Sequence, residues 1–188
     1  SSETFPRLKD LIEQCRNKAA ARLETFRWIV FNTMVGNSDS HLKNISFIVG
    51  HEGISVAPFY DLLCTAVYHT RVFLDEGAVW PNEKLASPVA GANFFSEVTY
   101  DKLIDTGLEL GLSKSAAGRE VGKIVGRLAD AADEIIAQME SILADPAAPQ
   151  GAPSPMTKAA ERRMLRSIRS IVIADMLRYV RLPVAAAK

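Results

Sequence analysis

The spacing of hydrophobic and polar residues follows a helical repeat over most of the chain. Apolar side chains recur at steps of three and four over residues 5–35, and a polar break near Asn17 divides this stretch into two predicted helices. Gly36 is a natural end for the second of them. The same spacing predicts three more helices, at residues 100–110, 113–143 and 156–182.

Two short runs follow a different pattern, in which β-branched and aromatic residues stand close together. They are residues 45–49 (ISFIV) and 54–57 (ISVA), and the turn-forming sequence GHEG separates them, which predicts a β-hairpin. Residues 66–100 contain several prolines and glycines, which predicts loop with short helical pieces. The predicted fold class is therefore mainly α with one small β-hairpin.

A stretch near the C-terminus has the composition of a linker. Residues 145–155 read DPAAPQGAPSP and contain no large apolar side chain. We expect a flexible surface linker at about 145–155, which limited proteolysis would cut before the helices on either side of it.

Composition places the chain among ordinary globular proteins. Hydrophobic residues make up 48% of its 188 residues and charged residues 23%, which suits one domain or one lobe of a larger protein. The 22 Lys and Arg balance 22 Asp and Glu, so net charge gives no argument for binding to nucleic acid or membranes. No apolar run reaches the roughly 20 residues of a transmembrane helix, and no signal-peptide pattern appears, so we expect a cytoplasmic location and no membrane partner.

The two cysteines, Cys15 and Cys64, both lie among apolar residues. This placement favours buried free thiols in a reducing compartment, and the alternative is a disulfide between them.

The densest polar cluster lies between two segments that are predicted to be buried. A helix ends at Gly36, a loop carries Asp39 to Asn44, and the predicted hairpin then returns the chain to Asp61. Because two strands joined by a tight turn begin and end close together, we expect Asp39, Asn44 and Asp61 to lie near one another.

These three residues offer the chemistry of a magnesium site. Carboxylate and carboxamide oxygens are hard donors that suit Mg²⁺. A loop Asp, an Asn five positions later and then a second Asp is also the order used by protein kinases, in which the first Asp accepts the proton of the attacking hydroxyl and the other two hold Mg²⁺ on the ATP phosphates. The alternative is a loop of ordinary capping and turn-forming polar residues.

The sequence around this cluster resembles the C-terminal domain of the HipA family, bacterial serine/threonine kinases best known as toxins of toxin–antitoxin systems. The family pattern runs Phe-Asn, a few apolar residues, Gly-Asn-x-Asp-x-His-x-Lys-Asn, a strand, and then Pro-x-Tyr-Asp. The chain matches this pattern within about residues 25–65, at Phe31, Asn32, Gly36, Asn37, Asp39, His41, Lys43, Asn44, Pro58, Tyr60 and Asp61.

The resemblance implies a role for each of five residues. Asp39 would be the catalytic base, and Asn44 and Asp61 would bind Mg²⁺ and, through it, ATP. Lys43 would be a second catalytic residue that contacts the transferred phosphate or neutralises the carboxylates, with a solvated loop lysine as the alternative. His41 would belong to the cofactor site, with a histidine that only hydrogen-bonds the loop backbone as the alternative.

The resemblance also implies a kinase of two lobes. Residues 1–188 contain neither a glycine-rich phosphate loop nor a strand lysine, so they resemble the helical C-terminal lobe alone. We therefore expect the N-terminal lobe to be a missing partner, and the isolated chain to transfer no phosphate. A non-catalytic module that docks a partner protein is the alternative from a different class, and a metal-dependent phosphohydrolase is a third hypothesis.

The predicted last helix carries a cluster of basic side chains, at Lys158, Arg162, Arg163, Arg166 and Arg169. A solvated basic face is the ordinary interpretation, and a contact with phosphate or the DNA backbone is the alternative. The resemblance makes DNA relevant, because HipA-like toxins pair with a helix-turn-helix antitoxin (HipB-like) on operator DNA.

Overall fold

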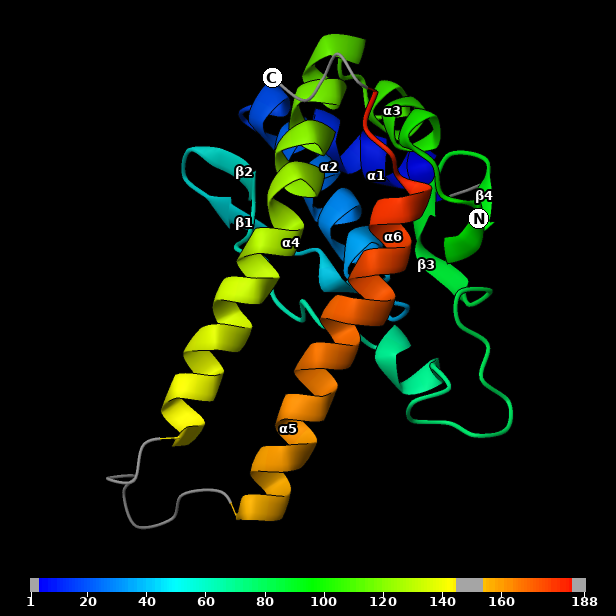
Figure 1. The fold of residues 1–188 in the computed structure, drawn as a ribbon. Helices are drawn as coiled ribbons and strands as arrows, with labels where there is room; N and C mark the ends of the chain where they lie inside the picture. The colour runs from blue at the N-terminus through cyan, green and yellow to red at the C-terminus, as the bar shows by residue number, and fades with distance from the viewer. Residues whose placement is uncertain (1–3, 145–153, 184–188) are drawn as a thin grey trace.

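The computed structural model describes residues 4–144 and 154–183. Helices dominate this part of the chain, as predicted (Figure 1). The α-helices are α1 (Thr4–Glu13), α2 (Lys18–Met34), α3 (Tyr100–Glu109), α4 (Lys114–Ala144), α5 (Pro155–Ser167) and α6 (Ala174–Tyr179). The strands are β1 (Phe47–Gly50), β2 (Gly53–Val56), β3 (Lys84–Val89) and β4 (Ala92–Phe94).

The polar break near Asn17 separates α1 from α2, as predicted. Asn17 caps α2 through its side chain, because its Oδ1 accepts a hydrogen bond of 3.0 Å from the backbone N–H of Ala20. Such a cap satisfies one of the donors that every helix start leaves free.

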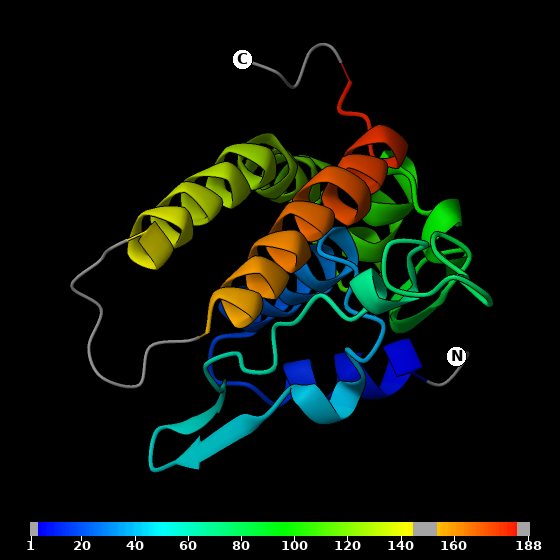
Figure 2. The same ribbon diagram turned by 60° about the horizontal axis from the view of Figure 1, so that its bottom comes forward.

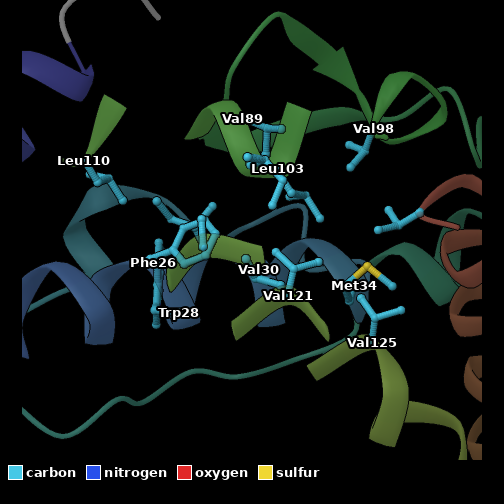
Figure 3. Packing of buried hydrophobic residues seen from close by; sticks show 14 of the residues in the cluster. Phe26, Trp28, Val30, Met34, Val89, Val98, Leu103, Leu110, Val121 and Val125 are labelled. Atoms are coloured by element: carbon cyan, nitrogen blue, oxygen red, sulfur yellow. The ribbon is translucent and has the colours of Figure 1, made fainter. Parts of the chain in front are cut away.

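Helix α2 is the centre of the core. Its buried side chains include Phe26, Trp28 and Met34, and Trp28 is only 2% exposed, as predicted for a core residue. Figure 3 shows these side chains among Val121 and Val125 of α4, with Val89 and Leu103 from β3 and α3 completing the cluster. Since burial of each large side chain contributes about 1.5–3 kcal/mol, this helix anchors the elements packed against it.

The predicted hairpin forms, with its strands shifted slightly along the sequence. β1 and β2 are antiparallel, with Phe47 opposite Val56 and Gly50 opposite Gly53. In both whole-molecule views the hairpin projects from the body (Figures 1 and 2). The first strand begins at Phe47 rather than residue 45 because the last residues of the polar loop form a helical turn, Leu42–Asn44.

A second strand pair was not predicted from the sequence. β3 and β4 are antiparallel around Gly91, whose φ is +63°. The prediction of loop for residues 84–94 was therefore wrong. Pro88 lies inside β3, and the pairing shifts register between Lys84 and Val89, so this pair lacks the regular alternation that identifies a strand.

The C-terminal helices form one rod with an irregular turn in it. Between α5 and α6, residues Ile168–Ile173 form a π-helical turn, which the regular spacing of the sequence did not reveal. The rod runs beside α4 in both views (Figures 1 and 2). The predicted linker falls mostly at residues 145–153, which lie outside the described residues.

Among the described residues, none of the helices combines the length and apolar character that a bilayer span requires. Cys15 and Cys64 are free thiols, and Cys15 is buried.

Gly36 is the point where α2, the polar loop and the C-terminal rod meet. Its φ is +69°, in the region that favours glycine. A Cβ at this position would lie 2.5 Å from Cγ1 of Val172 in the π-helical turn and 2.9 Å from Cβ of Ala66. The chain therefore has neither the backbone conformation nor the space for a side chain here.

Gly36→Ala should destabilise the fold by about 2–4 kcal/mol, because it adds left-handed backbone strain to overpacking. The matched control is Gly122→Ala in α4, where an added Cβ meets nothing within 4 Å. That change should be stabilising by about 0.5–1 kcal/mol through helix propensity. Urea unfolding of both variants measures the difference, and equal stabilities would contradict the close packing at Gly36.

A buried carboxylate joins α2 to α4. Glu120 is 4% exposed, and its Oε2 accepts a hydrogen bond of 2.7 Å from Nε of Arg27. Lys123 Nζ lies 3.2 Å from Oε1 of the same carboxylate. The hydrogen bond from Arg27 lowers the pKa of Glu120 below 4.5, its ordinary value.

This pair should make stability depend on pH. Because the folded-state pKa of Glu120 is lowered, the stabilisation is present above the unfolded pKa near 4.5 and is lost as the pH falls through the folded pKa. We expect Glu120→Gln to lose about 1 kcal/mol at pH 7 and to approach the parent as the pH falls through the lowered folded-state pKa. Urea unfolding at a series of pH values tests this, and a difference independent of pH would refute it.

Candidate active site

The polar loop lies on the surface between buried supports. It leaves α2 at Gly36, runs through Asp39 to the turn Leu42–Asn44, and continues into β1. Asp39, His41 and Lys43 are exposed, whereas Asn37 and Ser40 are buried. The loop thus presents charged groups outward while shorter polar side chains fix its backbone from beneath.

Asn44 brings the three residues of the predicted magnesium site together. Its Nδ2 donates a hydrogen bond of 3.1 Å to the backbone carbonyl of Asp39 and one of 3.0 Å to Oδ2 of Asp61. The β1–β2 hairpin makes this possible because it returns the chain to the neighbourhood of Asn44. The proximity that the sequence predicts is therefore present in the fold.

His41 faces the carboxylate of Asp39. Its Nε2 lies 2.8 Å from Asp39 Oδ1, and both side chains are substantially exposed. The histidine was predicted either to belong to the cofactor site or to hydrogen-bond only the loop backbone. The structure gives its ring a carboxylate partner, so His41 can orient Asp39, and its place in a cofactor site stays a prediction.

The side chain of Lys43 is exposed, and it makes no hydrogen bond or ion pair with any residue in the described part of the chain. Its backbone carbonyl accepts a hydrogen bond of 2.8 Å from the hydroxyl of Tyr60, which also lies 3.0 Å from Ser46 Oγ. The segment that leads into Asp61 is thereby tied to the loop, and the ammonium of Lys43 remains available to a ligand.

Asp61 has an unusual backbone conformation. Its φ is +57°, in the left-handed region, where a non-glycine residue costs about 1–2 kcal/mol. Asp and Asn tolerate this region better than most residues. Strained residues of this kind collect at functional sites, where neighbouring groups hold them in place.

A network of buried polar groups lies beneath the loop, and the sequence did not single it out. Asn37 Nδ2 donates to Asn32 Oδ1 (2.8 Å) and to the backbone carbonyl of Asp61 (3.0 Å), while its Oδ1 accepts from the backbone N–H of Asp39 (3.1 Å). Asn32 in turn donates to the carbonyl of Trp28 (2.9 Å). Asn32 and Asn37 were noted only as positions of the family pattern, which was the one available signal.

The loop is also supported from β3. Ser87 Oγ donates to the carbonyl of Ser40 (2.8 Å), and Ser40 Oγ donates to the carbonyl of Asn37 (2.8 Å). Both serines are almost fully buried. On the other side, the backbone N–H of Ser38 donates to Thr65 Oγ1 (2.7 Å).

The donor set fits a hard cation. In the described part of the chain, no group of three or more His, Cys, Asp and Glu side chains is placed to hold a metal ion. The oxygen donors available here are the carboxylate of Asp61 and the carboxamide of Asn44, with the carboxylate of Asp39 on the same loop as Asn44. One or two carboxylates completed by phosphate and water oxygens is the usual environment of Mg²⁺ in phosphate-transfer sites.

Cys64 lies three residues after Asp61 but is no candidate nucleophile. Burial raises the pKa of its thiol to about 12, so the thiol stays protonated at neutral pH. Thiolate chemistry is thus excluded beside the loop.

Three of the basic side chains of the last helix have partners within the chain that engage their guanidinium groups. Arg166 pairs with Glu140 (2.5 Å) and Arg169 with Asp133 (2.9 Å), which joins the C-terminal rod to α4. Arg163 stacks over the ring of Phe73 at 5.2 Å. These contacts neutralise or engage three of the five residues, which weakens the alternative of a DNA-binding face.

Two other side chains also have internal partners. His69, which was not predicted to have a role, lies with Nδ1 2.6 Å from Oε1 of the nearly buried Glu83. Trp80 Nε1 donates to Asp175 Oδ2 at 3.0 Å, so it is a structural contact to α6. His51 lies exposed in the hairpin turn.

Comparison with known proteins identifies relatives of the chain. A family model for the HipA-like C-terminal domain matches residues 1–142. The serine/threonine-protein kinase toxin HipA of Shewanella oneidensis is 40% identical over 65 residues, which cover 35% of this chain and 15% of that protein. The putative kinase Y4mE of Sinorhizobium fredii is 26% identical over 151 residues, which cover 78% of this chain and 34% of that protein.

A solved structure agrees with these matches. In the complex of HipA, HipB and operator DNA from Shewanella oneidensis MR-1, a chain superimposes with a TM-score of 0.68 and 25% identity, covering 94% of this chain and 35% of that one. The chain thus spans about a third or less of the length of each of these relatives. With a family model that matches most of its length and a fold that agrees, the chain belongs to the HipA-like C-terminal domain family.

Proposed function

We propose that residues 1–188 are the helical lobe of a HipA-like serine/threonine kinase, and that this lobe carries the catalytic loop for transfer of the ATP γ-phosphoryl group to a protein hydroxyl. The observation that carries the proposal is the double hydrogen bond of Asn44, to the carbonyl of Asp39 and to the carboxylate of Asp61. It ties the backbone of Asp39 to the carboxylate of Asp61 at one surface site, and the three residues follow one another in the order that kinases use.

Asp39 is the proposed catalytic base. Oδ1 faces Nε2 of His41 at 2.8 Å, and in the described residues Oδ2 has no hydrogen bond or ion pair, so it can accept the proton of a substrate hydroxyl. His41 fixes the orientation of the carboxylate. A base held in one rotamer loses less entropy when substrate arrives.

Asn44 and Asp61 are the proposed magnesium ligands. A half-turn of the Asn44 carboxamide exchanges Nδ2 for Oδ1, so both side chains can present oxygen to the same ion. When bound, Mg²⁺ would neutralise phosphate charge on ATP. Lys43, exposed on the same loop, is proposed to contact the transferred phosphate.

The remaining parts of the kinase are proposals that rest on the family. A separate N-terminal lobe would supply the nucleotide's other contacts, since this chain spans about a third of the related chain in the HipA, HipB and DNA complex. An antitoxin similar to HipB is the proposed partner, and DNA would be contacted through that complex.

A non-catalytic docking module is the second candidate function. The segment after Asp61 exposes several large apolar side chains: Leu62, Leu63, Tyr68, Leu74 and Val79. Contiguous exposed apolar surface marks sites for other proteins, and a docking module would use these side chains together.

The magnesium site can be tested with Asp61→Asn. Asn tolerates the left-handed backbone as well as Asp does, and the carboxylate is exposed, so stability in metal-free buffer should change by less than about 1 kcal/mol. The rise in melting temperature that Mg²⁺ gives the parent chain should be lost. Thermal unfolding with and without Mg²⁺ measures both quantities.

The matched control is Asp75→Asn, which removes one exposed carboxylate from the segment between Asp61 and β3. This variant should keep the response to Mg²⁺. A loss of several kcal/mol in Asp61→Asn without metal would make Asp61 a structural carboxylate. In a longer protein that contains this chain, Asp39→Asn should abolish phosphoryl transfer without changing the magnesium response by more than a few-fold. Full transfer activity in that variant would refute Asp39 as the catalytic base, whereas a parent protein without transfer activity would favour the docking module.

A further inference from the structure

A single buried carboxamide, that of Asn37, connects the two halves of the candidate site from below. It is 2% exposed and lies between the loop of Asp39 and the segment of Asp61, which are 22 residues apart in the sequence. Nothing in the proposed chemistry uses it directly, because it has no access to a substrate.

The orientation of this carboxamide is determined by its neighbours. Asn32 donates through Nδ2 to the carbonyl of Trp28, so its Oδ1 must face Asn37 and accept. Asn37 therefore presents Nδ2 on that side. Its second N–H then points to the carbonyl of Asp61 at 3.0 Å, and its Oδ1 is left to accept from the backbone N–H of Asp39 at 3.1 Å.

Both N–H donors and the carbonyl oxygen of the Asn37 side chain are engaged in this arrangement. An aspartate has the same shape and would keep the contact to the Asp39 N–H. Its second carboxylate oxygen would stand in the place of Nδ2 and face the oxygens of Asn32 and Asp61, so both donated hydrogen bonds would be lost. A leucine or alanine would lose all three contacts. The position therefore distinguishes a carboxamide from its nearest isostere.

The contact to Asp61 falls where the backbone needs support. Asp61 has the left-handed φ of +57°, and among non-glycine residues in the described part of the chain it alone has a positive φ. A donor fixed at its carbonyl oxygen holds the orientation of that peptide group. The side chain of Asp61 then points to Asn44, whose Nδ2 meets Oδ2 at 3.0 Å.

We propose that Asn37 is a positioning residue, whose carboxamide holds Asp61 in the left-handed conformation that directs its carboxylate into the candidate site. The proposal deepens the magnesium assignment and rests on it for its functional meaning. Asn32, which lies on α2, fixes the orientation of the Asn37 carboxamide. The position of α2 therefore affects where the carboxylate of Asp61 lies.

The test uses isotope-labelled chain and two variants. Asn37→Ala removes all three hydrogen bonds, and Asn37→Asp removes only the two donated ones. Ser87→Ala is the matched control, because it removes a buried hydroxyl that supports the same loop at Ser40 and hydrogen-bonds neither Asp61 nor Asn44. If Asn37→Ala fails to fold, Asn37→Asp retains the shape and carries the test.

The first readout is the metal-free NMR spectrum. Backbone chemical shifts of Asp61 should move out of the left-handed range in both Asn37 variants and stay unchanged in Ser87→Ala. The Asp39 amide should keep its position in Asn37→Asp, where its acceptor remains. Wild-type shifts for Asp61 in Asn37→Asp would overturn the proposal and leave Asn37 as a cap for the Asp39 turn.

The second readout is titration with Mg²⁺ alone, followed at the Asp61 and Asn44 signals. Both Asn37 variants should bind at least about fivefold more weakly than the parent, the effect of one lost hydrogen bond. The extra negative charge in Asn37→Asp would by itself strengthen binding, so weakening there opposes the charge effect. Equal affinities in parent and variants would overturn the proposal.

The two readouts separate this inference from the proposed function. A parent chain whose Asp61 signals ignore Mg²⁺ would refute the magnesium assignment. Movement of the Asp61 backbone in the Asn37 variants would then still establish that Asn37 holds its conformation.

Discussion

The close approach at Gly36 is the constraint on which the candidate site depends. α2 ends there because the chain turns left-handed, and Val172 and Ala66 occupy the space where a side chain would stand. The backbone N–H of Ala66 donates to the carbonyl of Gly36 at 2.9 Å, which ties the segment after Asp61 to the same point. Both arms of the site therefore start from one rigid junction, and their separation is set by packing, which has few alternatives in a dense interior.

The loop carries its charged side chains at the surface and its supporting polar side chains in the interior. The free-energy cost of burying each kind of group explains this division. An exposed carboxylate such as Asp39 or Asp61 keeps its hydration, so it costs little in the absence of a ligand. A buried carboxamide such as Asn37 would cost about 1–3 kcal/mol for an unsatisfied group, so it persists only where every hydrogen bond is made. The network beneath the loop meets that condition, and it can therefore hold the strained backbone of Asp61 without further compensation.

The sequence could predict the parts of this fold that repeat a local pattern. The break at Asn17, the stop at Gly36 and the hairpin after Asn44 each have a local cause, and together they predicted that Asp39, Asn44 and Asp61 would meet. The roles of these three residues stay predictions. The pair β3–β4 and the support from Ser87 could not be predicted, because Pro88 and a register shift conceal the strands. The pairing of His69 with Glu83 could not be predicted either, because the two residues are 14 positions apart and no spacing rule connects them.

The C-terminal rod lies beyond the residues that the family model matches, yet it also packs against the candidate site's support. The match to the HipA-like C-terminal domain family ends at residue 142. Val172 nevertheless packs at Gly36, and Asp175 accepts a hydrogen bond from Trp80. Ion pairs from Arg166 and Arg169 join the rod to α4, although exposed pairs of this kind contribute little on their own. The buried contact at Gly36 is the stronger connection. A π-helical turn at Ile168–Ile173 changes the direction in which the following side chains point, and this turn carries Val172. The geometry of the loop that bears Asp39 therefore depends on residues more than 130 positions away, which supports treating the rod as part of the same unit.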